Sequence, residues 1–122
     1  MAKGKLQGEF SLKFTSLTLT PGPAASTVIQ GNCEGSATGY GTVIGTVAFV
    51  GGKSGTFSGC WAAYLDNGEQ LSATEPGTYE SSGKHRWRTQ GVVHISDGIS
   101  IVSEGEIDLA TRSWTGKNFE NS

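Results

Sequence analysis

Residues 84–109, KHRWRTQGVVHISDGISIVSEGEIDL, decide the fold of this sequence. At their centre, Ser96-Asp97-Gly98 places glycine third in a short polar loop, where a type I turn and a left-handed residue close a three-residue hairpin with a G1 bulge. This turn predicts one mostly apolar face, with these pairs: Ile95 with Ile99, Val93 with Ile101, Gly91 with Ser103, Thr89 with Gly105, Trp87 with Ile107 and His85 with Leu109. It predicts polar or oppositely charged pairs on the other face: Arg86 with Asp108, Arg88 with Glu106 and Gln90 with Glu104.

Two earlier loops repeat the pattern. Asp66-Asn67-Gly68 aligns Trp61 with Ala73 and carries Glu75 opposite Gly59. Because side chains alternate between the faces of a strand, this register places Trp61 and Glu75 on the same lining face.

The loop Ser81-Ser82-Gly83 is expected to close the next hairpin in the same way. It sets Glu80 against Lys84 on the outer face and Tyr79 against His85 on the lining. Three turns of one kind thus predict one continuous lining between residues 57 and 109.

Strands are expected between the turn signals, at residues 4–19, 25–38, 41–50, 54–65, 69–80, 84–95, 99–109 and 114–120. A turn near Thr111-Arg112 joins the last two and sets Leu109 against Trp114, with Glu106 near Lys117 outside; residues 21–25 form a turn or loop of undefined type. Nineteen glycines against three prolines fit short strands joined by tight turns. Sequential hairpins without a helical crossover favour an all-β, eight-stranded antiparallel up-and-down barrel, a single domain over residues 1–122.

Composition excludes several function classes. The net charge of −2 gives no footprint for nucleic acid, and no apolar run is long enough to span a membrane. His85 and His94 fall on opposite faces and no metal-ligand spacing occurs, so no metal and no other cofactor is expected. Residues 1–10 have no export signal, which predicts a cytoplasmic location with reduced thiols. Cys33 and Cys60 are expected to pack in the interior, and a reactive or disulfide role is the alternative.

The polar residues of the predicted lining are the candidate catalytic groups. Glu75 among aromatic side chains has its charged form disfavoured, which raises its pKa toward the range useful for acid-base work. Tyr79 is placed to donate a hydrogen bond to a ligand oxygen, and His85 to shuttle a proton or to orient Tyr79. The pocket wall is predicted to consist of aromatic residues: Phe57, Trp61, Trp87 and Trp114.

Other interpretations compete with this one. Tyr79 and His85 lie beside a loop at the barrel rim, where polar tips commonly stay in water. Pro76-Gly77 favours a bulge, and one extra residue would turn Glu75 outward. An eight-stranded barrel either fills its interior with side chains or holds one small ligand, and large aromatics opposite glycines fit both outcomes.

The predicted outer face has two features. Its charged ladder is typical of a solvated wall. An apolar strip outside the barrel is a candidate subunit interface, and it consists of Ile44, Tyr64, Val102 and Phe119.

Two segments resemble a known group of proteins. They are residues 35–59, GSATGYGTVIGTVAFVGGKSGTFSG, and residues 103–116, SEGEIDLATRSWTG. Their glycine-and-strand pattern resembles the allene oxide cyclase barrel superfamily, which includes plant allene oxide cyclases, dirigent proteins and small bacterial proteins. The likeness extends over residues 28–120 and is nearest to the bacterial members.

The resemblance implies a calycin-like barrel whose cavity binds a small hydrophobic molecule, within a homodimer or homotrimer. Plant members cyclise an unsaturated fatty-acid epoxide, and dirigent proteins steer radical coupling without a cofactor. Both act largely by positioning a reactive ligand. Glu75 and Asn118 are nominated on face parity alone for the roles of the cyclase's buried glutamate and water-holding asparagine.

Three functions follow as hypotheses. The first is a cofactor-independent isomerase or cyclase for a hydrophobic substrate, with Glu75 as acid or base. The second is a non-catalytic binding or carrier module that uses the same cavity. The third is a filled barrel whose outer surface mediates assembly.

Overall fold

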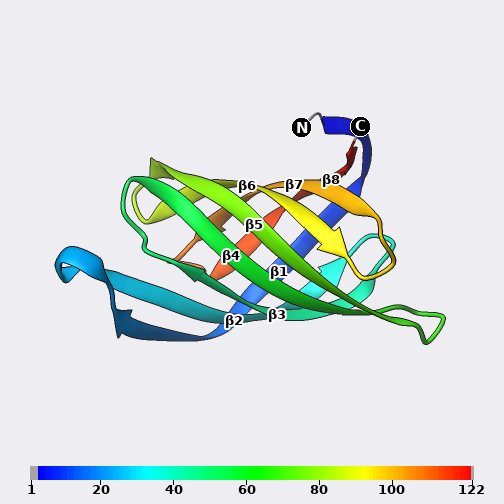
Figure 1. Ribbon diagram of the computed structural model, residues 1–122, viewed down its shortest axis with the longest axis horizontal. Helices are drawn as coiled ribbons and strands as arrows, with labels where there is room; N and C mark the ends of the chain where they lie inside the picture. The colour runs from blue at the N-terminus through cyan, green and yellow to red at the C-terminus, as the bar shows by residue number, and fades with distance from the viewer. Residues whose placement is uncertain (1–2, 122) are drawn as a thin grey trace.

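The eight strands follow one another around a closed antiparallel barrel in chain order, as the computed structural model, which describes residues 3–121, shows in Figure 1. The fold predicted from the turns is therefore confirmed. The strands are β1 (Lys3–Pro21), β2 (Thr27–Ala37), β3 (Gly41–Phe49), β4 (Ser54–Tyr64), β5 (Gln70–Gly83), β6 (Arg86–Ile95), β7 (Ser100–Asp108) and β8 (Ser113–Asn121). The untyped loop contains a 3₁₀ turn, η1 (Pro23–Ala25). No helix among the described residues is long and apolar enough to cross a membrane.

Two of the three glycine-ended loops set the register as predicted. The Ser96–Gly98 loop pairs Trp87 with Ile107, and Gly98 adopts φ 92° while its N–H donates to the carbonyl of Ile95 at 2.9 Å. The Asp66–Gly68 loop pairs Gly59 with Glu75, and Gly68 adopts φ 93°. Both have the left-handed glycine that a G1 bulge requires.

The turn between β5 and β6 lies further along the chain than predicted. Glu80 lies opposite Arg88 rather than Lys84, so β5 runs through Ser81-Ser82-Gly83 and the chain reverses at Lys84 and His85. His85, not Gly83, takes the left-handed conformation, at φ 57°. The predicted pairing of Tyr79 with His85 is therefore wrong. Because the shift is even, Tyr79 keeps its place on the lining.

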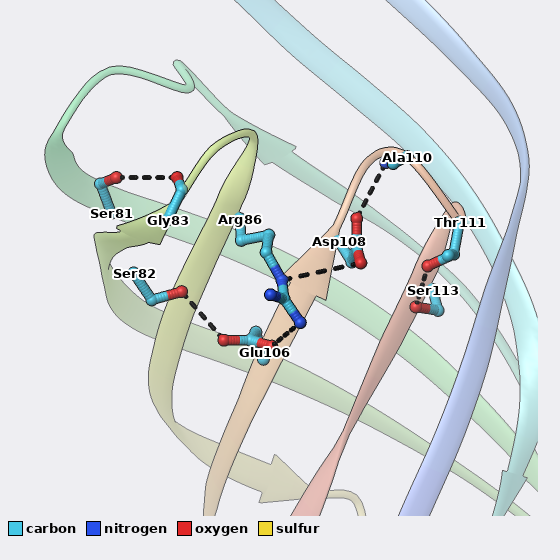
Figure 2. A network of polar contacts seen from close by, with 9 residues as sticks. All are labelled: Ser81, Ser82, Gly83, Arg86, Glu106, Asp108, Ala110, Thr111 and Ser113. Atoms are coloured by element: carbon cyan, nitrogen blue, oxygen red, sulfur yellow. Dashed lines mark hydrogen bonds and ion pairs between the residues drawn. The ribbon is translucent and has the colours of Figure 1, made fainter.

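Polar contacts on the outer wall hold this new turn (Figure 2). Arg86 reaches Glu106 at 3.4 Å and Asp108 at 3.7 Å, while the Ser82 hydroxyl donates to Glu106 at 2.9 Å. One strand earlier, Arg88 Nη1 lies 3.1 Å from Glu80 Oε1. These contacts are exposed or only partly buried and have small individual energies, but they favour the observed register over the one predicted.

The last turn is also displaced. Trp114 lies opposite Ile107 rather than Leu109, and Lys117 lies opposite Glu104 rather than Glu106. Arg112 adopts φ 53°, which closes a longer loop than the two-residue turn expected there. Again the shift is even, so Trp114 still faces the interior.

The core is the barrel interior. Inward side chains alternate with outward ones along each strand, and the buried set consists of Phe10, Leu12, Phe14, Cys33, Val43, Val47, Phe49, Phe57, Trp61, Tyr79, Trp87, Ile107 and Trp114. Trp114 is the largest fully buried side chain, with ring centroids of Phe57 at 5.4 Å and Trp61 at 5.5 Å. Its position near the middle of this aromatic cluster divides the interior into two halves.

The cysteines differ from expectation at one position. Cys33 is buried, and burial raises the pKa of its thiol to about 12. Cys60 is exposed on the outer face of β4, so its predicted place in the interior is wrong. Both thiols are free.

The predicted outer apolar strip does not exist as one surface. Ile44 and Tyr64 lie on the adjacent strands β3 and β4, whereas Val102 and Phe119 pair across β7 and β8. Two further strands separate these pairs in either direction around the barrel. The prediction failed because face parity does not tell how far apart two strands lie around a ring.

Candidate functional site

A small cavity lies between the central aromatic cluster and one end of the barrel. Its volume is about 80 Å³, and its walls come from both ends of the sequence and from all eight strands. The lining is mostly apolar, with Phe10, Leu12, Val43, Trp61, Ala63, Leu71, Ala73, Val93, Ile95, Ile101 and Trp114 among its residues. The polar exceptions include Glu75, Ser103 and Asn118.

Glu75 is the charged residue best placed in this cavity. Its side chain is 4% exposed, and Oε1 accepts a hydrogen bond of 3.0 Å from the indole N–H of Trp61. The other carboxyl oxygen, Oε2, is buried and has no hydrogen-bond partner. A buried polar atom without a partner is costly, so this oxygen marks a place where a ligand or water would bind favourably.

Burial changes the acidity of this group. Removal from water raises the pKa of the Glu75 carboxyl from 4.5 to about 7, although the hydrogen bond from Trp61 acts in the opposite direction. Near neutral pH the group is therefore poised between the acid and the carboxylate, as a general acid or base requires. This agrees with the expectation drawn from the sequence.

The strand that carries Glu75 is regular at the critical point. Pro76 lies opposite Ser58 and Gly77 opposite Phe57, in the same register as Glu75 with Gly59. No bulge turns the carboxylate outward. β5 keeps its register with both neighbouring strands on either side of Pro76.

Glycines accommodate the two side chains of the site. A Cβ atom at Gly59 would lie 2.9 Å from Trp61 Nε1, and one at Gly91 would collide with Glu75 Oε2. The space expected opposite the large residues is thus occupied by those residues themselves. The cavity is only what this packing leaves free.

Three of the predicted pocket residues line the cavity. Trp61 and Trp114 form its inner boundary, and Asn118 reaches it from β8. Asn118 is 7% exposed and lies opposite Ser103 on β7. It is positioned to offer a donor and an acceptor to the same ligand that meets Glu75.

The other predicted site residues lie elsewhere. Phe57 belongs to the central cluster beside Trp114, whereas Tyr79 and Trp87 are buried toward the opposite end of the barrel, and none of the three lines the cavity. His85 is exposed in the β5–β6 turn at that same end, so its predicted place on the lining is wrong. Glu75 and these residues therefore do not form one constellation.

Tyr79 and Trp87 instead close their end of the barrel. The Tyr79 hydroxyl accepts from the N–H of Gly51 at 3.1 Å, and the Trp87 indole donates to the carbonyl of Gly52 at 2.8 Å. Phe49 stacks edge-on against both rings, with centroids 5.8 Å apart in each pair. The β3–β4 loop is thereby held by the aromatic residues beneath it.

The residues at the cavity mouth were missed by the sequence reasoning. They are small or aliphatic at Ala37, Ala63, Leu71, Ala73 and Ile95, with Tyr40 from the β2–β3 loop beside them. Burial, and secondly the charge of Asp97, raise the pKa of Tyr40, which indicates that Asp97 lies close to the mouth. The register predicted from the Asp66–Gly68 loop did place Ala63, Leu71 and Ala73 on the lining, and the observed pairing of Ala63 with Leu71 agrees with it. These side chains were interpreted as core packing and not as site residues.

No cluster of three or more His, Cys, Asp or Glu side chains within residues 3–121 could hold a metal ion. Comparison of the chain with protein-family models, with curated proteins and with solved structures finds no match. The likeness to the allene oxide cyclase barrel therefore stays a prediction, and the function has to be argued from the site.

Proposed function

We propose that this barrel binds a small, mostly apolar molecule whose acceptor oxygen is hydrogen-bonded by the protonated Glu75 carboxyl. One observation carries the proposal: Glu75 lies in the wall of a mostly apolar cavity, and its carboxyl oxygen Oε2 is buried without a hydrogen-bond partner. Ligand sites in proteins commonly combine apolar walls with a few placed polar groups.

The hydrogen bond from Trp61 determines which oxygen carries the proton. An indole N–H can only donate, so Oε1 acts as an acceptor at all times. In the neutral acid the proton therefore belongs on Oε2, the oxygen without a partner. A ketone, ether or epoxide oxygen on the ligand would complete this arrangement, whereas a ligand carboxylate would be repelled once Glu75 ionises.

The size of the cavity limits the ligand. Pockets for drug-sized ligands have volumes of roughly 300–1,000 Å³, against about 80 Å³ here. A single water needs roughly 10–15 Å³, so the cavity admits several waters or a small ring. A longer molecule would have to extend through the mouth.

The same geometry supports a catalytic form of the proposal. An acid with a pKa of about 7 can give a proton to a ligand oxygen and regain one later in the cycle. Such proton transfer, with an apolar wall that fixes the ligand's shape, is what a cofactor-independent isomerase or cyclase requires. This form, and the kinship with allene oxide cyclase barrels, rest on the resemblance of residues 35–59 and 103–116.

Binding of a small ketone tests the proposal. Cyclopentanone is titrated against cyclopentane while the indole N–H resonance of Trp61 is followed by NMR at about pH 5.5 and about pH 8.5, on either side of the Glu75 pKa of about 7. The wild type is expected to bind the ketone more tightly than cyclopentane at the lower pH. Its ketone affinity falls on the order of 30-fold at the higher pH, because the donor proton is lost.

Glu75→Gln separates the hydrogen bond from other effects of pH. The amide oxygen can still accept from Trp61 and its N–H₂ can still donate, so ketone binding becomes independent of pH. Glu34→Gln, an exposed change on β2, leaves the wild-type pH dependence unchanged. Equal affinity for ketone and hydrocarbon in the wild type would refute the assigned role of Glu75.

The catalytic form has its own readout. Small molecules extracted from the purified protein are identified by mass spectrometry and then incubated with fresh wild-type protein or with Glu75→Gln. Conversion by the wild type alone supports the isomerase or cyclase. Retention without conversion by either protein supports the carrier.

A further inference from the structure

The hairpin formed by β1 and β2 extends beyond the closed end of the barrel, at the left of Figure 1. Residues 16–21 of β1 pair with residues 27–32 of β2. On its other side β1 pairs with β8 only as far as Lys13 opposite Ser113, and the N–H of Phe14 donates to Arg112 at 2.9 Å. Within the described part of the chain, residues 15–21 therefore present one strand edge with no partner strand.

This edge has no charged side chain to protect it. Natural edge strands are commonly guarded by charged side chains, which discourage pairing with another chain. The hairpin sequence FTSLTLTPGPAASTVIQGNC, residues 14–33, contains no charged residue. Pro21 ends the free edge, but the six residues before it keep their backbone N–H groups.

An apolar face accompanies the edge. The bulge at Thr15 restores Leu17 and Leu19 to the face that continues the barrel lining, opposite Gly31 and Ile29. Both leucines lie beyond the core, and they are 37% and 64% exposed. Seven consecutive exposed residues with alternating leucines are typical of an edge strand that pairs with another strand.

We propose that this edge pairs with the same edge of a second copy of the protein to form a symmetric dimer. An antiparallel strand pair is compatible with a two-fold axis, so one segment can serve both sides of the interface. Full overlap of residues 15–21 places the axis at Thr18. Leu17 of each copy then lies opposite Leu19 of the other, and four leucines cover one another on one face.

The charge of the hairpin and the position of the cavity mouth are compatible with this dimer. No charge within residues 14–33 opposes another across the axis. The hairpin projects from the end closed by Tyr79 and Trp87, so both cavity mouths face away from the interface. One strand pair is small beside a standard interface of about 1,600 Å², so the dimer is reversible and forms at micromolar or higher concentration. The inference does not depend on the proposed ligand.

Disulfide trapping tests the register. In a Cys60→Ser background, which removes the exposed native thiol, Thr18→Cys is expected to give a covalent dimer under copper-phenanthroline oxidation. Two cysteines facing each other across an antiparallel pair lie within disulfide range. Ser16→Cys is the matched control, because position 16 lies opposite position 20. It should cross-link poorly alone but efficiently when mixed with Thr20→Cys.

Sedimentation equilibrium tests the interface without a cross-link. The wild type is expected to shift from monomer toward dimer between micromolar and near-millimolar concentration. Thr18→Lys puts two like charges on the axis at an exposed position and should weaken the dimer at least tenfold, with an unchanged circular dichroism spectrum. A wild type that stays monomeric, or a dimer broken by Ile44→Lys and not by Thr18→Lys, would overturn the proposal.

Discussion

The turns at the two ends of the barrel reverse the chain with different kinds of residue. At the cavity end, the residues with positive φ are glycines: Gly39, Gly41, Gly68 and Gly98. At the closed end, where Gly51 also lies, they include Ala24, Ala25, His85 and Arg112. A side chain in the left-handed region costs roughly 1–2 kcal/mol, so the closed end contains strain that the cavity end avoids.

The packing of the interior also differs between the two ends, and it is denser at the end with the strained turns. The closed end is filled by Phe49, Tyr79 and Trp87, whose polar atoms hold the β3–β4 loop. The mouth is lined instead by small and aliphatic residues. Dense aromatic packing offsets strained turns at one end, and relaxed turns accompany loose packing at the other. One continuous barrel can thus have a densely packed half and a half that contains a cavity.

Trp114→Ala is expected to have the largest effect among the variants that test the difference in packing between the two halves. The indole packs against Phe10, Phe14, Phe57 and Trp61, and its N–H donates to Thr89 at 3.1 Å. We expect a loss of about 3–5 kcal/mol in unfolding free energy, as for other large aromatics removed from a core. Urea denaturation followed by circular dichroism measures it.

Leu71→Ala at the mouth is the variant with which that loss is compared. Leu71 is only half-buried, so its removal should cost less than about 2 kcal/mol. Equal losses in the two variants would show that the two halves do not differ in packing.

Glu75 gives the next largest effect, as a dependence of stability on pH. The unfolded chain releases this proton near pH 4.5 and the folded protein near 7, so the contribution of the neutral acid is complete below pH 4.5 and is lost as the pH rises to about 7. The difference in unfolding free energy between wild type and Glu75→Gln should shift by about 3 kcal/mol against the wild type over that interval. Urea unfolding at a series of pH values measures the difference, and parallel curves would contradict the assigned burial of the charge.

Tyr79→Phe removes the hydrogen bond between the Gly51 N–H and the Tyr79 hydroxyl at the closed end. Loss of the contact to the Gly51 N–H should cost about 1 kcal/mol. Hydrogen exchange should accelerate at the Gly51 amide while the amides of the β4–β5 turn stay unchanged. Tyr64→Phe, at a 43% exposed tyrosine, serves as the control and should change neither quantity.

The turns give the smallest effects, and these have opposite signs at the two ends. His85→Gly relieves a left-handed side chain at φ 57°, so thermal unfolding should show a gain of roughly 0.5 kcal/mol after the added chain entropy is subtracted. Gly98→Ala, at φ 92° with no atom within 4 Å, should instead lose about 1 kcal/mol from conformation alone. Changes of the same sign would remove the contrast between the ends.

The contrast also explains how much of the fold could be predicted from the sequence. Loops with glycine at the left-handed position, at Gly68 and Gly98, gave the register of their hairpins correctly. The turns at His85 and Arg112 were misplaced, because a left-handed histidine or arginine has no sequence signal and Gly83 offered a false one. Both errors were even shifts, so the barrel and the inward residues survived them.

The site was predictable to the same degree. Face parity placed Glu75 beside Trp61, and the buried hydrogen bond between them confirms that neighbourhood. Parity could not show how far along the barrel axis a residue lies. Tyr79 and Trp87 therefore entered the predicted site although they lie at the other end, and the alanines at the mouth were overlooked.

The β3–β4 loop, which Tyr79 and Trp87 hold over the closed end of the barrel, has a consequence for ligand binding. Under the proposed function, a molecule that enters at the mouth meets Glu75 with its leading group, and its trailing part stays near the mouth. We therefore expect recognition to be strict toward the head of the molecule and permissive toward the length of its tail. Homologous series of tailed compounds should accordingly share one binding mode.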